Sequence, residues 1–169
     1  MRLRVRVVFA ALAMLVMWGC GYTFQGAKAP EGALLEIPVF LNKSVETGVE
    51  AIFTDQLISE MRRTPGWKVV EPGQARYVLK GSILSFVSEP HAVSSRKLAV
   101  EHRATMVLDV RFLEKSSGKE LWRDKNLRIF ADYLVGPDVL ASERAKKEAI
   151  VRIAQEAASR IRTRVQDTW

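Results

Sequence analysis

The clearest pattern in this sequence is an alternation of apolar and polar residues over two neighbouring segments, residues 100–112 and 120–133. A period of two is typical of β-strands that have one side on a hydrophobic core. The apolar side of the first segment consists of Val100, His102, Ala104, Met106, Leu108, Val110 and Phe112. Because residues 116–119 (Ser-Ser-Gly-Lys) favour a turn, the two segments are predicted to form an antiparallel hairpin.

The same alternation predicts the register of this hairpin. When Lys115 pairs with Glu120, the apolar sides of both strands face the same way, whereas a slip of one residue would turn every apolar side chain to the wrong face. The expected pairs are Leu108–Leu127, Met106–Ile129, Ala104–Ala131, His102–Tyr133, Arg103–Asp132, Arg111–Asp124 and Leu113–Trp122. Positions near the turn fit this register less well, which predicts a bulge around residues 124–126.

Apolar residues also recur at helical spacing in a segment that begins near Thr47 and ends before Pro65-Gly66. Its stripe consists of Val49, Ile52, Phe53, Leu57 and Met61. Thr47 and Glu50 have the spacing of a capping box, in which a hydroxyl and a carboxylate bind free amides of the first turn. We therefore predict an amphipathic helix with one face on the core.

A second helix is predicted after Gly136-Pro137, with Asp138 or Ser142 as its N-cap. Its apolar line consists of Ala149, Ile150, Ile153, Ala154, Ala157, Ile161 and Val165. Alanines in this line allow the helix to lie close to a sheet. Basic and acidic residues alternate over the rest of its surface, which is typical of a side that faces solvent.

Three weaker segments complete the predicted sheet. Residues 34–40 form a short apolar run in which Pro38 favours an edge position, because proline lacks an amide donor. Residues 67–70 and 77–87 are the other two, and Gly81 predicts a bulge in the longer one. This order of elements predicts an α+β fold, a two-layer sandwich with two helices packed on one face of a mixed, mostly antiparallel sheet of about four strands.

The sheet face without helices is expected to carry both charged and aromatic side chains. Its predicted members are Arg103, Thr105, Val107, Asp109, Arg111, Trp122, Asp124, Arg128 and Phe130. This mixture is too polar for a hydrophobic core and richer in aromatics than an ordinary solvated surface. A solvated face and a wet interface with a partner protein are the two interpretations.

The N-terminal segment has the features of a secretory signal. Arg2, Arg4 and Arg6 precede an apolar run at residues 7–18, which is shorter than the roughly 20 residues that span a bilayer. The run ends at Gly19 and Cys20, the only cysteine of the chain.

This ending resembles a bacterial lipoprotein signal, in which the chain is cut before the cysteine and the cysteine is acylated. The alternative is an ordinary signal with a free or buried cysteine nearby. Several acyl chains hold a protein on a membrane where one chain would not. We expect residues 1–19 to be a lipoprotein signal peptide, residues 20–32 the lipidated N-terminus and a short tether, and residues 33–169 a single α+β domain. By the same resemblance, Gly21 after the cysteine permits transfer to the outer membrane.

Composition narrows the possible partners. The chain has 169 residues and a net charge of +7, and loss of the signal leaves 23 basic and 19 acidic residues, a net charge of +4. This mild excess suits an anionic lipid or a phosphorylated glycan. Export makes nucleic acid an unsuitable partner, so none is expected.

The residues that carry catalysis or metal binding lack a recognisable arrangement. His91 and His102 are the only histidines, and His102 falls on the apolar side of its strand. We find no metal-ligand spacing, no G-x-S-x-G sequence and no phosphate-binding loop. The sequence therefore predicts no enzyme, no cofactor and no metal site, and a periplasmic hydrolase lacks its catalytic residues.

The chain as a whole resembles the lipopolysaccharide-assembly lipoproteins of the LptE family. The resemblance rests on Cys20-Gly21-Tyr22 after the signal, followed by a short strand, a helix, a three-strand meander and an Ala-rich C-terminal helix. It implies a protein that is anchored in the outer membrane through acyl chains on Cys20 and faces the periplasm. It also implies a protein that plugs the lumen of the LptD β-barrel, helps the barrel to assemble and takes part in inserting lipopolysaccharide. The residues expected to face the barrel are Arg103, Arg111, Trp122, Arg128 and Phe130.

The resemblance also implies a basic pole that binds lipopolysaccharide. The predicted loop at residues 88–97 and the connection at residues 136–142 should lie at one end of the sheet, and the turn at residues 116–119 and the tether at the other. Arginine and lysine suit phosphate groups. The candidate residues are Arg96, Lys97, Arg144 and Lys146. Scattered surface charge is the alternative interpretation of these four residues.

A different function fits a lipoprotein of this size. Some outer-membrane lipoproteins reach into the periplasm and activate a peptidoglycan synthase. Such a protein usually has a long tether, whereas residues 22–32 are short, which favours work done at the membrane.

Overall fold

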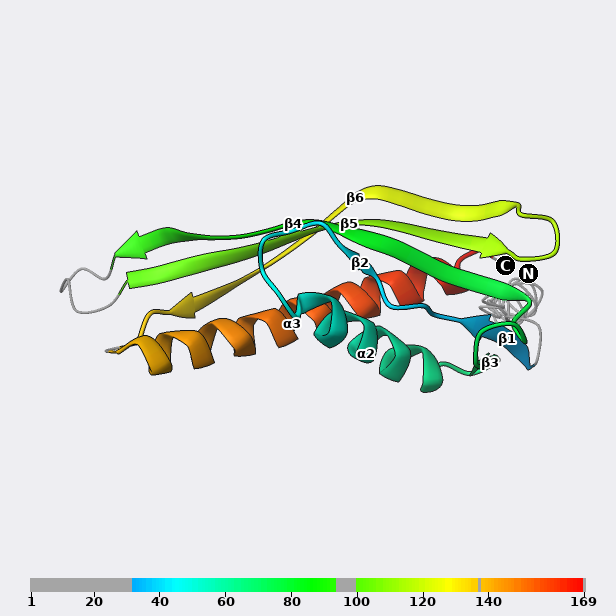
Figure 1. The fold of residues 1–169 in the computed structure, drawn as a ribbon, viewed down its shortest axis with the longest axis horizontal. Coiled ribbons are helices and arrows are strands. Elements are labelled where there is room, and N and C mark those ends of the chain that lie inside the picture. Colours follow the sequence, from blue (N-terminus) through cyan, green and yellow to red (C-terminus); the bar gives the residue numbers. More distant parts are fainter. Residues whose placement is uncertain (1–31, 94–99, 137, 169) are drawn as a thin grey trace, which may run out of the picture.

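The computed structural model of this protein describes residues 32–93, 100–136 and 138–168. They form two layers, a twisted β-sheet and two helices that cover one of its faces (Figure 1), which confirms the predicted α+β sandwich. The helices are α2 (Val49–Arg62) and α3 (Val139–Gln166). The strands are β1 (Ala33–Glu36), β2 (Leu41–Asn42), β3 (Trp67–Val69), β4 (Tyr77–Val93), β5 (Val100–Glu114) and β6 (Glu120–Leu134).

The sheet differs from the prediction in size and in strand direction. It has six strands rather than about four, in the order β3-β1-β4-β5-β6 with β2 beside β4. The pairs β1–β3, β1–β4 and β2–β4 are parallel, and only β4–β5 and β5–β6 are antiparallel. The sheet is therefore mixed, not mostly antiparallel. Of the short strands, β1 and β3 fall in segments that were predicted, whereas β2, with two residues, is too short for alternation to reveal it.

The segment around Pro38 is not one edge strand, as expected, but two short strands with a break. β1 lies inside the sheet between β3 and β4, and Pro38 falls between β1 and β2, where no ladder amide is required. The break is attached to α2 by a buried hydrogen bond in which the Phe40 amide donates to the Thr54 hydroxyl over 3.1 Å.

The register of the β5–β6 hairpin is confirmed over most of its length. Five expected pairs are present, namely His102–Tyr133, Arg103–Asp132, Ala104–Ala131, Met106–Ile129 and Leu108–Leu127. The two pairs expected nearest the turn are wrong, because Arg111 lies opposite Arg123 and Leu113 opposite Glu120. The register shifts between Leu127 and Asp124, where the bulge was predicted, and again near the turn. Before the bulge, the side chains of β6 therefore point to the opposite faces of the sheet from those that an unbroken alternation would give.

Strand β4 is longer than predicted and pairs with β5 up to Val93. Its two irregularities lie between Ile83 and Ser85 and between Pro90 and Ala92, not at Gly81. Gly81 pairs with Val110 in regular fashion. Glycine at this position allows β5 and the Phe40 ring to approach β4 closely. A Cβ atom there would overlap the Asp109 carbonyl oxygen and lie 2.6 Å from the Phe40 ring.

The helices begin differently from each other. Asp138 caps α3 as predicted, and its carboxylate accepts a 2.7 Å hydrogen bond from the Ala141 amide. The capping box of α2 is not formed, because Gly48, in the left-handed conformation, is the N-cap and has no side chain to donate or accept. Instead the Glu50 carboxylate accepts a 2.8 Å hydrogen bond from the side-chain amide nitrogen of Asn42.

The core lies between the sheet and the two helices. Both predicted apolar stripes face it, and Phe53, Leu57, Ala157 and Ile161 are fully buried. Aromatic rings at the end near β1 pack edge to face, with the Trp67 ring centroid 5.6 Å from that of Phe112. Such pairs stabilise a core by about 0.5–1.5 kcal/mol beyond the area that they bury.

The long axis of the molecule separates two ends (Figure 1). The start of α3 lies at the same end as the last residues of β4 and the first of β5. The β5–β6 turn, the start of β1 and the last turns of α3 lie at the other end. This agrees with the predicted ends for the β5–β6 turn and for the connection before α3, whereas residues 88–93 belong to β4 and not to a loop. The tether up to residue 31 and residues 94–97 lie outside the described residues.

Candidate functional site

The sheet face without helices, here called the open face, carries an ordered pair of charges beside an aromatic ring. Arg103 donates from Nε to Asp132 Oδ1 over 2.7 Å and from Nη2 to Oδ2 over 2.8 Å. The Arg103 guanidinium also lies 4.3 Å from the centre of the Phe130 ring. Because Asp132 holds the guanidinium and the guanidinium stacks on the ring, Phe130 is fixed in place although its side chain is 56% exposed.

These charges perturb each other in the expected directions. The hydrogen bonds from Arg103 hold the pKa of the Asp132 carboxyl below its ordinary value. Further along the open face, Arg123 binds the Asp109 carboxylate through two hydrogen bonds of 3.0 and 2.7 Å and lowers the pKa of Asp109. Arg111 lies 3.5 Å from the same carboxylate. The open face is thus polar but ordered.

A shallow hollow of about 280 Å³ lies next to the Arg103–Phe130 pair on the open face. Its lining includes Val87, Glu89, His91, Thr105 and Arg128. Arg128 is exposed and forms no ion pair with any residue that the structure describes. The hollow therefore combines apolar, cationic and anionic groups, which suits a protein side chain better than a lipid tail.

Four of the five residues predicted to face a partner lie on the open face. They are Arg103, Arg111, Arg128 and Phe130. The fifth placement is wrong, because the bulge in β6 puts Trp122 opposite the buried Phe112 and turns its ring toward α3. Asp124 moves to the helix side for the same reason, and Arg123 takes its place on the open face. Sequence reasoning missed Arg123 because an unbulged strand would point it inward.

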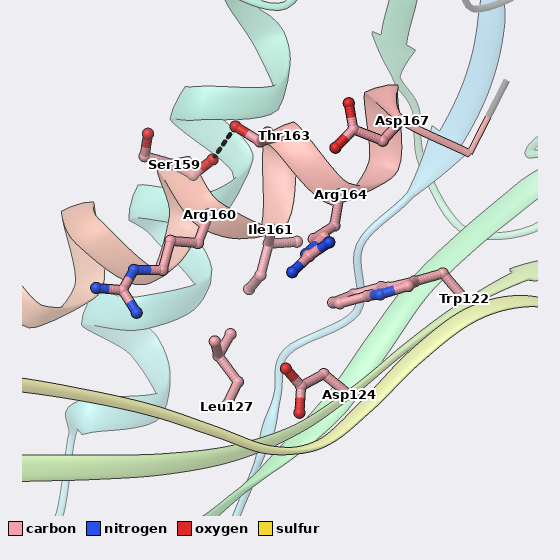
Figure 2. Close-up of a pocket in the computed structure, with 9 residues that line it drawn as sticks. All are labelled: Trp122, Asp124, Leu127, Ser159, Arg160, Ile161, Thr163, Arg164 and Asp167. Carbon is pink, nitrogen blue, oxygen red and sulfur yellow. Dashed lines mark hydrogen bonds between the residues drawn. The ribbon is translucent and has the colours of Figure 1, made fainter.

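The relocated Trp122 lines a groove between β6 and the last turns of α3, here called the Trp122 groove. Its volume is about 480 Å³. Figure 2 shows the Trp122 ring and the Arg164 side chain turned toward each other, with Leu127 and Ile161 facing the space between strand and helix. The Arg160 side chain points away from Trp122 and binds Glu156 over 2.8 Å. The groove thus has an apolar floor and a polar rim.

At the opposite end, α3 begins among exposed apolar and basic residues. A hollow of about 730 Å³ separates the start of α2 from this part of α3, and its lining includes Ile52, Leu140, Arg144, Lys147 and Ile150. The Leu140 side chain is 70% exposed. Arg144 forms no ion pair within the described part of the chain.

The structure describes two of the four predicted basic residues at this end. Lys146 binds Glu46 over 2.9 Å and Glu143 over 3.2 Å, and Glu46 raises the pKa of the ammonium group. Its charge is therefore already compensated, unlike that of Arg144. Arg96 and Lys97 lie outside the described residues, as does Cys20.

The described residues hold no group of three or more side chains able to bind a metal ion. Within the same residues, no helix combines the length and apolar character needed to span a membrane.

Comparison with known proteins decides the family. The model of the lipopolysaccharide-assembly family LptE matches residues 34–165, which is most of the chain. This protein belongs to the LptE family. The search of curated protein sequences finds no match to this chain.

Solved structures with the same fold include several lipoproteins. A putative lipoprotein from Caulobacter crescentus CB15 has a TM-score of 0.54 at 18% identity, over 76% of the chain described here and 88% of its own. The rare lipoprotein B of Shewanella oneidensis has a TM-score of 0.52 at 18% identity, over 80% and 95% of the two chains. A putative neuraminyllactose-binding hemagglutinin homolog from Helicobacter pylori has a TM-score of 0.54 at 15% identity, over 84% and 90%. At these identities the likeness establishes the fold alone.

Proposed function

We propose that this LptE-family protein is an outer-membrane lipoprotein that occupies the lumen of an LptD-type β-barrel, assists its assembly and takes part in inserting lipopolysaccharide. The observation that carries this proposal is the open face, which is ordered by ion pairs and yet left uncovered by helices. The interior of a large transmembrane barrel is polar, so a polar and rigid surface suits it. In this role the protein binds and positions other molecules and is not an enzyme.

The dimensions of the molecule support a plug. Helix α3 has 28 residues, which corresponds to about 42 Å at 1.5 Å per residue. The hydrocarbon core of a bilayer is about 30 Å thick. A body of this length extends through the lumen of a barrel when its long axis lies along the barrel axis.

The membrane anchor is part of the same proposal. Cleavage after residue 19 and acylation of Cys20 attach the N-terminus to the membrane, and Gly21 permits transfer to the outer membrane. The first described strand begins at Ala33, at the end of the molecule that also holds the β5–β6 turn. The anchor therefore attaches to one end of the body, with the exposed residues at the start of α3 at the far end.

The function is tested by gentle detergent purification of the tagged protein from outer membranes, with the product analysed before and after heating. We expect a large β-barrel, recognised by its heat-dependent mobility, in a one-to-one ratio with the lipoprotein. Recovery of a peptidoglycan synthase, or of the lipoprotein alone, would contradict the plug and favour the other class of outer-membrane lipoprotein.

We further propose that lipopolysaccharide contacts the basic pole formed by Arg96, Lys97, Arg144 and Lys146. Arg144 is exposed beside the hollow at the start of α3, where the exposed apolar side chain of Leu140 is available to an acyl chain. Guanidinium groups bind phosphates through paired hydrogen bonds. Lys146 contributes less direct contact, because two carboxylates already hold it.

Charge reversal at the pole should weaken lipopolysaccharide binding. The triple variant Arg96→Glu, Lys97→Glu and Arg144→Glu is expected to bind at least tenfold less, because like charges then face the lipid phosphates. The measurement is retention of labelled lipopolysaccharide by the purified protein. Arg62→Glu with Arg63→Glu, at the end of α2, is the control and should bind normally. Unchanged binding by the triple variant would rule out the pole.

A further inference from the structure

The Trp122 groove is an apolar recess that the proposed barrel contacts do not use. Trp122, Leu127 and Ile161 form its floor, and it lies on the helix side of β6 rather than on the open face. Two carboxylates on its rim, those of Asp124 and Asp167, form no ion pair with any described residue. The Arg164 guanidinium lines the same groove and also forms no ion pair with a described residue, so the rim carries charges of both signs. An apolar recess with such a rim suits an aromatic segment that has polar neighbours.

We propose that residues 21–31 of this same chain bind the Trp122 groove, with the Phe24 ring against the Trp122 indole. This segment contains two aromatic residues, Tyr22 and Phe24, among small and polar ones. In an extended chain, residues two apart point to the same side, so both rings face one surface. Stacked or edge-to-face rings favour each other beyond the area that they bury.

The length of the segment allows this placement. The strand pairings put Trp122 opposite Phe112, Phe112 opposite Leu79, and the start of β4 beside β1. Trp122 is therefore separated from Ala33 by three strand spacings across the sheet and by about four residues along the strand direction. Together these offsets place the groove roughly 20 Å from Ala33. Phe24 precedes Ala33 by nine residues, which span up to about 30 Å when extended.

The position of the chain ends agrees with this route. The start of β1 and the last turns of α3 lie at the same end of the molecule (Figure 1). A chain that leaves β1 there reaches the groove by passing the end of α3 at Asp167, without crossing the open face.

Docking of this segment would fix the distance between the anchor and the body. Cys20 lies four residues before Phe24, so docking would keep Cys20 within about 13 Å of the groove. Without docking, Cys20 could lie up to about three times as far from Ala33, the first residue of β1. This inference does not depend on the barrel, because the groove and the segment belong to one chain.

The test places a photo-crosslinking residue in the segment of the full-length, processed protein in detergent. With Phe24→p-benzoylphenylalanine, irradiation should join residue 24 to peptides from residues 120–127 or 159–168 of the same molecule, as identified by mass spectrometry. The same probe at Val45, an exposed residue near the start of α2, is the control. We expect at least tenfold more crosslink to these peptides from position 24 than from position 45.

Filling the groove should reduce the yield of the crosslink. Thr163→Trp replaces an exposed groove residue and is expected to lower the yield at least fivefold. Ser159→Trp serves the same purpose if the first variant fails to fold. Gln155→Trp, exposed on the same helix outside the groove, should leave the yield unchanged. Crosslinking of residue 24 only to detergent, to another protein or to other parts of the chain would overturn the proposal. Co-purification of the barrel is measured separately. Failure of the docking proposal can therefore be distinguished from failure of the proposed function.

Discussion

Replacing Gly81 with valine is expected to lower the free energy of unfolding by about 3 kcal/mol. Gly81 has ordinary strand backbone, so the cost does not come from its conformation. A side chain there would overlap the backbone carbonyl of Asp109 on β5 and press on the buried Phe40 ring. Because backbone cannot yield as a flexible side chain does, the β4–β5 pairing must separate locally.

Denaturant unfolding of the purified variant measures this loss. Gly118→Ala is a matched control, since Gly118 has a positive φ of 67° but open space around its Cα atom. Its cost should be about 1 kcal/mol and come from backbone conformation alone. If Gly81→Val were no more costly than Gly118→Ala, the close approach of β4, β5 and Phe40 would be refuted.

Phe130→Ala is expected to reduce recovery of the barrel partner at least tenfold while leaving the fold intact. The ring is exposed yet held in place by Arg103 and Asp132, and preorganised aromatic and arginine side chains carry much of the binding energy of interfaces. Truncation of an exposed side chain changes the free energy of unfolding by about 0.5 kcal/mol or less. The measurement is quantitative co-purification, alongside thermal unfolding of the isolated variant.

The control for this variant is Leu140→Ala, which truncates another exposed apolar residue, at the far end of the molecule. It should leave the barrel yield unchanged. Equal recovery of the barrel with Phe130→Ala and with the unaltered protein would show that the open face does not bind the barrel. The helical side would then be the surface to test.

The sequence was most informative where strands are long and one side is buried. Alternation from His102 to Leu108 predicted the register with the far part of β6, and the ion pair between Arg103 and Asp132 formed as expected. The apolar stripes of both helices were also correct, because helical spacing over many residues leaves few alternatives.

The prediction failed where a single residue changes the geometry. The bulge region was recognised, but its effect on the residues before it was not, so Trp122 was assigned to the wrong face. Gly48 replaced the expected cap because a left-handed glycine turns the chain into α2 without any side-chain hydrogen bond. The Trp122 groove could not be foreseen, because it arises from the approach of α3 to the bulged strand and not from a local motif.

The irregularities of β6 also bear on solubility. This strand forms one border of the sheet and has 15 residues, and a long, straight border of this kind invites pairing with other molecules. Its register shifts twice along its length, and the Arg152 guanidinium occupies the carbonyl oxygen of Asp132 at 2.9 Å. Another molecule therefore meets an irregular row of donors and acceptors along this strand, a feature that in natural sheets counteracts edge-to-edge pairing.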